Sequence, residues 1–196
     1  MTIRISKPAF NLREKITQLE GRVPFERMPV GSMMLIGRNT ASNQTNISSN
    51  QSWTNIVGAD IEVHPRLASS LLEIHMNFSM EADGGPNGIG FRIYRQLKYM
   101  SNVAGPAVKI YDNYQHSHWS SSTPSWTGPG TIILEVYDNP YSAVADVDGG
   151  VTTDVTTKGT SVYYYAQGYK EVGNNLYVNY GQDAEGLLVT VKEIRQ

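Results

Sequence analysis

The side chains best suited to bind a metal ion lie in an aromatic and polar stretch near the middle of the chain. His116 and His118 are separated by one residue, so both point to the same side of an extended strand. Three such pairs around a threefold axis would supply six imidazole nitrogens, a set that suits an octahedral transition metal. The alternative, and the expectation here, is a pair of surface or interface histidines without a metal.

Two tryptophans in the same stretch could bind a sugar or a protein. Trp119 and Trp126 flank the segment Ser-Ser-Ser-Thr-Pro-Ser and lie near Tyr111 and Tyr114 in the sequence. Aromatic rings beside polar groups can bind sugar rings or a protein partner. Three interpretations remain open: a receptor-binding loop, a protein–protein contact, or loop aromatics folded back onto their own domain.

An acidic segment further on suggests calcium but does not fit the best-known calcium motif. Asp146, Asp148 and Asp154 are spaced within nine residues. The EF-hand pattern requires a glycine at its sixth position and a glutamate at its twelfth, where this chain has Val151 and Thr157. We expect an acidic turn, with a different kind of calcium loop as the alternative.

No pattern for catalysis is present. The chain contains no nucleophile elbow, no zinc-protease helix motif and no phosphate-binding loop. His75 is expected on the solvent-facing side of its strand, where a surface residue is a better interpretation than a general base. We therefore predict a protein that is not an enzyme and uses no cofactor.

The composition narrows the class of protein further. The chain has 196 residues, no cysteine and a net charge of −2. Disulfides and thiolate metal sites are thereby excluded, and a near-neutral chain without clustered Lys and Arg is a poor nucleic-acid binder. No apolar run approaches the roughly 18 residues that would span a bilayer, and the N-terminus lacks the apolar region of a secretory signal. We expect neither nucleic acid nor a membrane as partner.

The first thirty residues differ from the rest and predict an anchoring arm. Residues 1–30 carry a charge of +3, which leaves −5 for residues 31–196. Asn11 is a plausible N-cap for a short helix ending near Gly21. Such a helix is marginal alone in water and has to dock on something. The apolar side chains expected to dock are Phe10, Leu12, Ile16 and Leu19. The alternative is a frayed tail without a function.

Residues 31–196 are expected to form one all-β domain. The segment 32–38 is a short apolar strand, and the polar run 39–52 has nothing to bury, so it is a surface loop or an edge. From Trp53 onward apolar and polar residues alternate, as in the segment 71–80. Glycine-rich turns separate seven to nine such strands, which predicts an antiparallel sandwich or barrel.

One strand is rich in tyrosine on both faces. Tyr163, Tyr165 and Tyr169 lie on one side and Val162, Tyr164 and Ala166 on the other. Large residues on both faces suggest a strand covered by the core on one side and by a neighbouring subunit on the other, a role that suits tyrosine. The alternative is a strand buried wholly within its own domain.

The order of segments in residues 31–194 resembles a jelly-roll domain found widely in structural proteins of tailed phages. The matching pieces are Gly31–Ile36, SWTNIVGADIEVHPR, SSLLEIHMNF, GFRIYR, LEVYDNP, TSVYYYAQGY and VTVKEI. The opening KPAFNLREKITQLE resembles the leader peptide of structural proteins from tailed phages of marine bacteria. Residues 97–130 match no part of the pattern.

This resemblance implies a virion component on the surface of a phage particle. Proteins of this type look like tail fibres, head fibres or decorations of the capsid or tail, and they commonly form trimers. We expect a tail-fibre or tail-appendage protein that is bound to other virion proteins through residues 1–30 and trimerises through the jelly roll. The alternatives are a capsid decoration or head-fibre protein and a lectin-like module for a host-surface glycan.

Overall fold

The computed structural model describes residues 25–67, 69–82, 87–98, 104–117, 130–140, 161–173, 175–179 and 186–196. Within these ranges the chain forms one short 3-10 helix and ten strands. They are η1 (Phe25–Arg27), β1 (Met33–Ala41), β2 (Thr45–Ile47), β3 (Ser52–Val63), β4 (Leu71–Ala82), β5 (Asn87–Lys98), β6 (Ala104–Ser117), β7 (Gly130–Asp138), β8 (Ser161–Val172), β9 (Leu176–Val178) and β10 (Leu187–Ile194).

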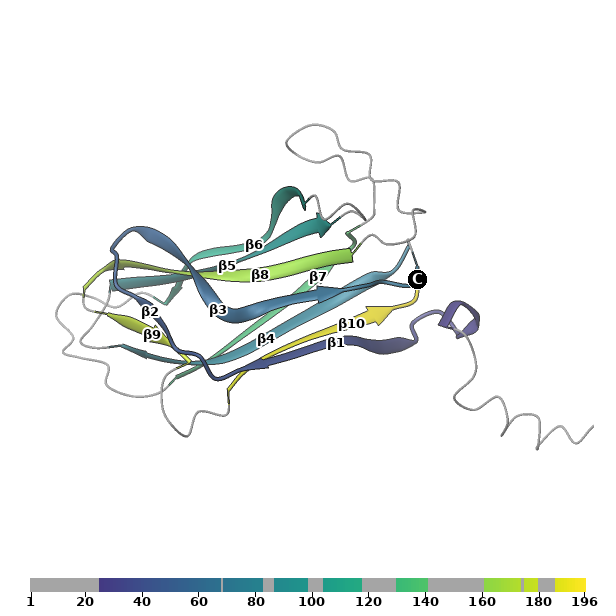
Figure 1. The fold of residues 1–196 in the computed structure, drawn as a ribbon, viewed down its shortest axis with the longest axis horizontal. Coiled ribbons are helices and arrows are strands. Elements are labelled where there is room, and N and C mark those ends of the chain that lie inside the picture. Colours follow the sequence, from purple (N-terminus) through teal and green to yellow (C-terminus); the bar gives the residue numbers. More distant parts are fainter. Residues whose placement is uncertain are drawn as a thin grey trace, which may run out of the picture.

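The strands form two antiparallel sheets that pack face to face (Figure 1). The larger sheet has the order β1-β10-β4-β9-β2, with β7 paired to β4. The smaller sheet has the order β3-β8-β5-β6. Both ends of the domain meet at β1, where the Gly31 amide donates to the Arg195 carbonyl at 2.7 Å.

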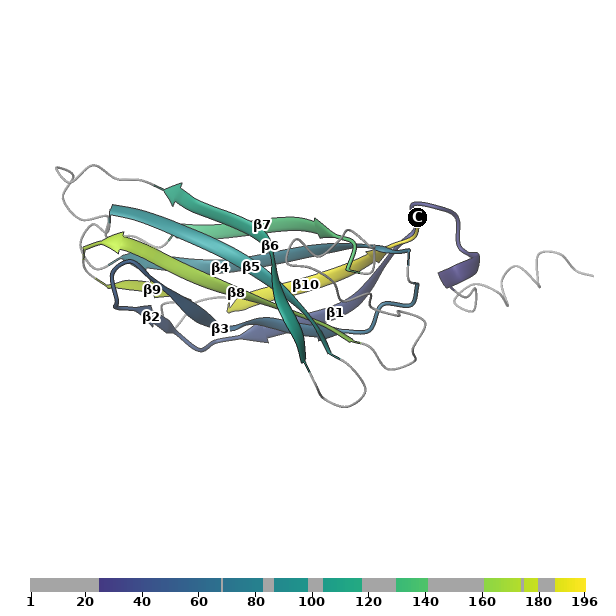
Figure 2. The same ribbon diagram turned by 90° about the horizontal axis from the view of Figure 1, so that it is seen from above.

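The strand order is that of a jelly roll. Without the three-residue strands β2 and β9, the larger sheet is β1-β10-β4-β7, and Figure 2 shows these four side by side. Apart from β2 and β9, successive strands along the chain alternate between the two sheets except at β5 and β6, which are neighbours in the smaller sheet, and this connectivity is that of two interlocked Greek keys. The predicted all-β jelly-roll sandwich is therefore confirmed, whereas the predicted N-terminal helix lies outside the described residues.

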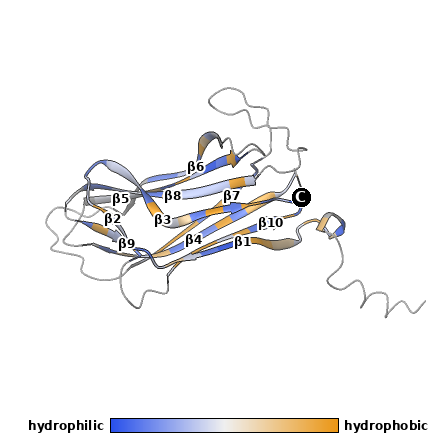
Figure 3. Ribbon diagram, viewed as in Figure 1, coloured by the Kyte–Doolittle hydropathy of each residue, from blue (hydrophilic) through white to orange (hydrophobic). Residues whose placement is uncertain are grey.

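The core lies between the sheets and follows the period of two. Along β4, the inward side chains Leu72, Ile74, Met76, Phe78 and Met80 are at most 3% exposed. The strands accordingly carry bands of hydrophobic and hydrophilic residues in Figure 3. Phe78 meets Phe91 from the opposite sheet, with ring centroids 5.3 Å apart. Burial of this apolar surface is the main stabilising contribution to the fold.

The polar run 39–52 corrects one expectation. The prediction that it buries nothing is wrong, because it contains β2, and Ile47 within it is fully buried. Thr45 is also buried, and its hydroxyl accepts a hydrogen bond from the Val57 amide at 2.8 Å. The expectation of an edge is confirmed, since β2 ends the path of its sheet. Ile47 is a single apolar residue among many polar ones, which is too weak a sequence signal to predict a buried strand.

Candidate functional site

The outer face of the smaller sheet carries a row of aromatic and cationic side chains drawn from β3, β5 and β8. The strand register sets Tyr94 on β5 opposite Tyr165 on β8, and Trp53 on β3 opposite Tyr169. All of these side chains point away from the core because the alternate positions fill it. We call the following six residues the aromatic stack: Trp53, Arg92, Tyr94, Tyr165, Tyr163 and Lys98.

The members of the aromatic stack contact one another in sequence. The Arg92 guanidinium lies 4.0 Å from the centre of the Trp53 ring and 5.1 Å from that of Tyr94. Tyr94 stacks on Tyr165 at 5.2 Å, with 15° between the ring planes, and Tyr165 lies 5.7 Å from Tyr163. The Lys98 ammonium ends the row, 4.5 Å from the Tyr163 ring. Both cations are held in favourable cation–π positions.

Hydrogen bonds across the strands hold the stack in place. Arg92 donates to the Gln167 side chain at 2.7 Å, and Gln167 donates to Asn55 at 2.6 Å. At the other end, the Tyr163 hydroxyl donates to Asp60 at 3.1 Å, and Lys98 pairs with Glu62 at 2.7 Å. Fixed rings and fixed charges lower the entropy that a partner would have to remove on binding.

The electrostatics of the face follow from these contacts. Burial raises the pKa of Tyr163 to about 12, and the negative charge of Asp60 acts in the same direction. Hydrogen bonds from Lys98 and from the Ser161 hydroxyl lower the pKa of Glu62. At neutral pH the face therefore presents neutral phenols, with Lys98 paired to Glu62 at one end and the Arg92 charge held by Gln167 and two aromatic rings at the other.

This arrangement suits a protein partner better than a sugar. A sugar ring stacks on an open aromatic face, but in the stack the ring faces are largely taken up by neighbouring rings and by the two cations. The ring edges and hydroxyl groups remain for a partner. Tyr, Trp and Arg are also the residues that contribute most to binding at the centres of protein interfaces.

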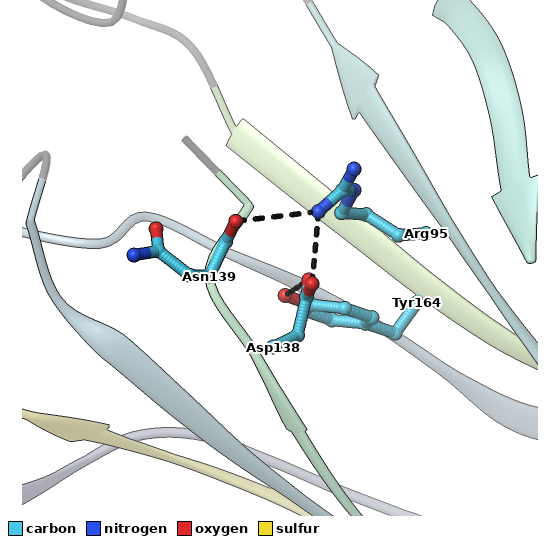
Figure 4. Close-up of polar contacts among 4 residues, drawn as sticks. All are labelled: Arg95, Asp138, Asn139 and Tyr164. Carbon is cyan, nitrogen blue, oxygen red and sulfur yellow. Dashed lines mark hydrogen bonds and ion pairs between the residues drawn. The ribbon is translucent and has the colours of Figure 1, made fainter. Parts of the chain in front are cut away.

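A buried polar cluster joins the two sheets at one end of the sandwich (Figure 4). Asp138 ends β7 in the larger sheet, and its carboxylate accepts hydrogen bonds from Arg95 on β5 and from the Tyr164 hydroxyl on β8, both at 2.8 Å. Arg95 lies 3.5 Å from the Asn139 carbonyl as well. Burial raises the pKa of Asp138, while the Arg95 charge opposes that rise.

A second buried carboxylate lies in the same row of the larger sheet. Leu72 on β4 has Asp138 opposite it on one side and Glu193 of β10 on the other. Glu193 is fully buried, and its Oε1 accepts hydrogen bonds from the Arg66 and Leu67 amides and from the Ser70 hydroxyl at 2.6–2.9 Å. These contacts fix the connection between β3 and β4, so both carboxylates act in holding this end of the sandwich.

The predicted tyrosine strand is β8. Val162, Tyr164 and Ala166 are fully buried in the core, while Tyr163 and Tyr165 are half-buried on the outer face. Tyr169 shares that face but is 3% exposed, because Trp53 packs against it at 5.0 Å. A partner at this face would therefore touch Tyr163 and Tyr165 directly and reach the third tyrosine through Trp53.

Several predicted residues lie outside the described part of the chain. These are the arm residues Phe10, Leu12, Ile16 and Leu19, the tryptophans Trp119 and Trp126, His118, and the acidic segment from Asp146 to Asp154. His116 lies on β6, and its side chain is likewise outside the description. Among the described residues, no group of three or more His, Asp or Glu side chains is arranged to hold a metal ion.

Sequence reasoning missed four members of the aromatic stack, Trp53, Arg92, Tyr94 and Lys98, and both buried carboxylates as site residues. A signal for the carboxylates exists in the alternation: Asp138 follows Ile132, Leu134 and Val136 at intervals of two, and all are inward.

Among the described residues, no helix is long and apolar enough to cross a membrane.

Comparison with known proteins yields weak likenesses. No family model matches the chain, and no curated protein matches it. Among solved structures, the infectious bursal disease virus Gt strain shares 13% identity at a TM-score of 0.39 over 84% of this chain and 38% of the other. A mutant VP2 protein of that virus, in derived T=1 particles, shares 12% identity at a TM-score of 0.37 over 88% of this chain and 40% of the other.

The chain thus spans about two fifths of the length of the viral chains it is similar to. Identities near 12% and TM-scores below 0.5 place it in no family. The class of protein defined by its own strands is an all-β jelly-roll sandwich with a preorganised aromatic outer face.

Proposed function

We propose that this protein is a structural component of a virus particle that assembles by self-association of its jelly roll. The observation that carries the self-association is the aromatic stack, a rigid row of ring edges and hydroxyl groups on the outer face of β3, β8 and β5. The assignment to a virus particle is supported by the resemblance of the segment order to structural proteins of tailed phages. For a monomeric domain, ordering so many large side chains at its surface adds little stability. At an interface, the same side chains provide contact area, and because they are already ordered, binding loses less conformational entropy. The likeness to the VP2 chains, at TM-scores below 0.5, adds no weight to it.

The finer assignment rests on the resemblance of the segment order to tailed-phage proteins. In this proposal the protein is a tail-fibre or tail-appendage component on the particle surface, and three copies meet through Tyr163 and Tyr165. A capsid decoration is the alternative within the same class. No observation in the described residues favours a glycan-binding module, since Trp119 and Trp126 lie outside them.

Replacing Tyr165 by lysine is expected to convert the trimer into a monomer. The new ammonium would lie opposite Asp60, so the protomer tolerates it, but a partner would have to bury it. Loss of a central interface tyrosine typically costs about 3 kcal/mol, or roughly a 100-fold weaker association. Sedimentation velocity at micromolar concentration measures the change.

The control for that experiment is Leu35→Lys on β1, in the opposite sheet. Leu35 is 55% exposed, so the substitution adds the same charge to a different face. It should leave the trimer intact. A monomeric parent protein, or equal effects of the two substitutions, would exclude the aromatic stack as the trimer interface.

Residues 1–30 are proposed to anchor the domain to other virion proteins. A chain lacking residues 1–24 loses Phe10, Leu12, Ile16 and Leu19 but keeps the buried Phe25 and the Gly31–Arg195 hydrogen bond. We expect it to fold and self-associate normally, with at least a tenfold loss of incorporation into particles, measured by quantitative mass spectrometry. Normal incorporation would show that the arm is not the anchor; full-length Leu12→Ala/Ile16→Ala should reproduce the loss.

A further inference from the structure

The edge strand of a β-sheet has backbone amides and carbonyls on its free side that can form hydrogen bonds with another strand. Proteins usually guard such edges with bulges, prolines, lysines or a covering segment. The described residues of this protein place strands β1, β3, β6 and β7 at the long edges of the two sheets. Three of these four edges are guarded in a recognisable way.

The guarded edges are β1, β3 and β6. β6 contains Pro106 and Lys109, and its register with β5 shifts at three places. β3 shifts its register between Asn55 and Asp60. β1 shifts near Gly37, and Asn39 donates hydrogen bonds to the β3 backbone, at 2.7 Å in the shorter case. Each of these features hinders the addition of another strand.

Within the described residues, β7 has none of these guards. All nine of its residues pair with β4 in one unbroken register, and no other described strand pairs with its second edge. Its sequence, Gly-Thr-Ile-Ile-Leu-Glu-Val-Tyr-Asp, has no proline, no lysine and a run of strong strand formers. Two of its outward side chains, Ile133 and Tyr137, are 56% and 54% exposed. Such a segment is the kind that pairs with another chain.

The sequence of β7 is complementary to itself in one antiparallel register. A two-fold axis at Leu134 sets Thr131 opposite Tyr137 of the second copy and Ile133 opposite Glu135. All nine residues then pair, and the inward side chains of both copies stay on the same side of the joined sheet. An axis at Glu135 would instead set two carboxylates against each other, which is unfavourable.

We propose that β7 is a self-pairing edge, which joins β7 of a second copy antiparallel about a two-fold axis at Leu134. The occupant is a second copy because the register satisfies all nine residues without like charges in opposition. One strand pair buries much less area than the roughly 1,200–2,000 Å² of a stable interface, so the contact is weak for single domains. Copies already linked into a larger assembly would strengthen it through multivalency.

Charge placement at position 133 tests the register. In the Tyr165→Lys background, which removes the proposed trimer contact, Ile133→Glu sets a second carboxylate against Glu135 of the other copy, twice per dimer. Ile133→Lys sets an ammonium there instead. We expect the Ile133→Glu variant to dimerise at least tenfold more weakly than its parent and the Ile133→Lys variant to dimerise at least as well, by sedimentation equilibrium up to several hundred micromolar. Equal behaviour of the two variants overturns the proposal.

Disulfide mapping provides a second, independent measurement, because the chain contains no cysteine. Opposed residues in an antiparallel pair have Cβ atoms about 4.5–5.5 Å apart, close enough to cross-link after small adjustments. A mixture of Thr131→Cys and Tyr137→Cys chains should form a mixed disulfide rapidly. A mixture of Thr131→Cys and Ile133→Cys chains should not, because the register separates these positions by four residues, or about 13 Å.

The two proposals can fail separately. Mixed disulfides at 131 and 137 in a protein that forms no trimer would support the β7 contact and reject the trimer through the aromatic stack. A trimer with equal cross-linking in both mixtures, or with none, would reject the β7 contact alone. Circular dichroism of each variant checks that the sandwich is folded.

Discussion

Replacing Glu193 by alanine is expected to lower the free energy of unfolding by about 4 kcal/mol. The carboxylate is fully buried and accepts hydrogen bonds from two backbone amides, those of Arg66 and Leu67, and from the Ser70 hydroxyl. Alanine leaves two partly buried amides and the buried Ser70 hydroxyl without this acceptor, and each such loss costs about 1–3 kcal/mol, with the partly buried amides at the lower end. It also leaves a cavity where the β3–β4 connection packs. Chemical denaturation monitored by tryptophan fluorescence measures the change.

Glu193→Gln and Ser70→Ala are the matched controls. Glutamine keeps one oxygen for the two amides, so we expect a loss of about 1–2 kcal/mol. Ser70→Ala removes one of the three donors and should cost about 1 kcal/mol. If Glu193→Ala were no worse than Ser70→Ala, the two backbone hydrogen bonds would not be important for stability.

The alternation of residues was enough to predict the inward face of most strands. Leu72, Ile74 and Met76 were expected to share one face, and all three are fully buried. The reason is physical: one sheet face must be removed from water, and the side-chain period of two assigns residues to that face without knowledge of the strand's neighbours. The jelly-roll order itself came from the resemblance, because alternation says nothing about which strand pairs with which.

The aromatic stack could not be predicted in the same way. It depends on the register of β5 against β8, which sets Tyr94 opposite Tyr165 although the two are far apart in the sequence. The predicted tyrosine face supplied two of the six members, while Trp53 and Arg92 came from strands treated as ordinary sandwich strands. β6 was predicted only as a short strand at His116, because its described side chains from 105 to 113, with Pro106 among them, show no clear alternation of burial.

The two buried carboxylates, Asp138 and Glu193, show a second limit of prediction from the sequence. Their inward position follows from counting by two along β7 and β10, but an acid at the end of a strand can equally turn out into water. The partners decide the matter: Arg95 and Tyr164 of the opposite sheet hold Asp138, and the connection between β3 and β4 holds Glu193. An inward acid at a strand end is therefore a useful signal to seek in related sequences.

Replacing Asp138 by alanine is expected to cost about 3 kcal/mol of stability. The change leaves the Arg95 guanidinium, 17% exposed, without its carboxylate, and it removes the acceptor of the buried Tyr164 hydroxyl. A domain of this size loses about 2–4 °C in Tm per kcal/mol, so a drop of roughly 6–12 °C is expected by calorimetry. Tyr164→Phe removes the hydrogen bond to Asp138 while keeping the ion pair with Arg95, and it should cost about 1 kcal/mol.

The pH dependence of the stability of Asp138→Asn tests whether burial raises the pKa of the Asp138 carboxyl by more than the ion pair with Arg95 lowers it. Burial raises the pKa of Asp138 above its ordinary value despite the Arg95 charge. A carboxyl whose pKa is raised on folding contributes stability that is present below its unfolded pKa and is lost as pH rises through its folded pKa. The stability of the parent relative to Asp138→Asn should therefore increase as pH falls from 7 to 4. A decrease over that range would show that Arg95 dominates and that the folded pKa is in fact lowered.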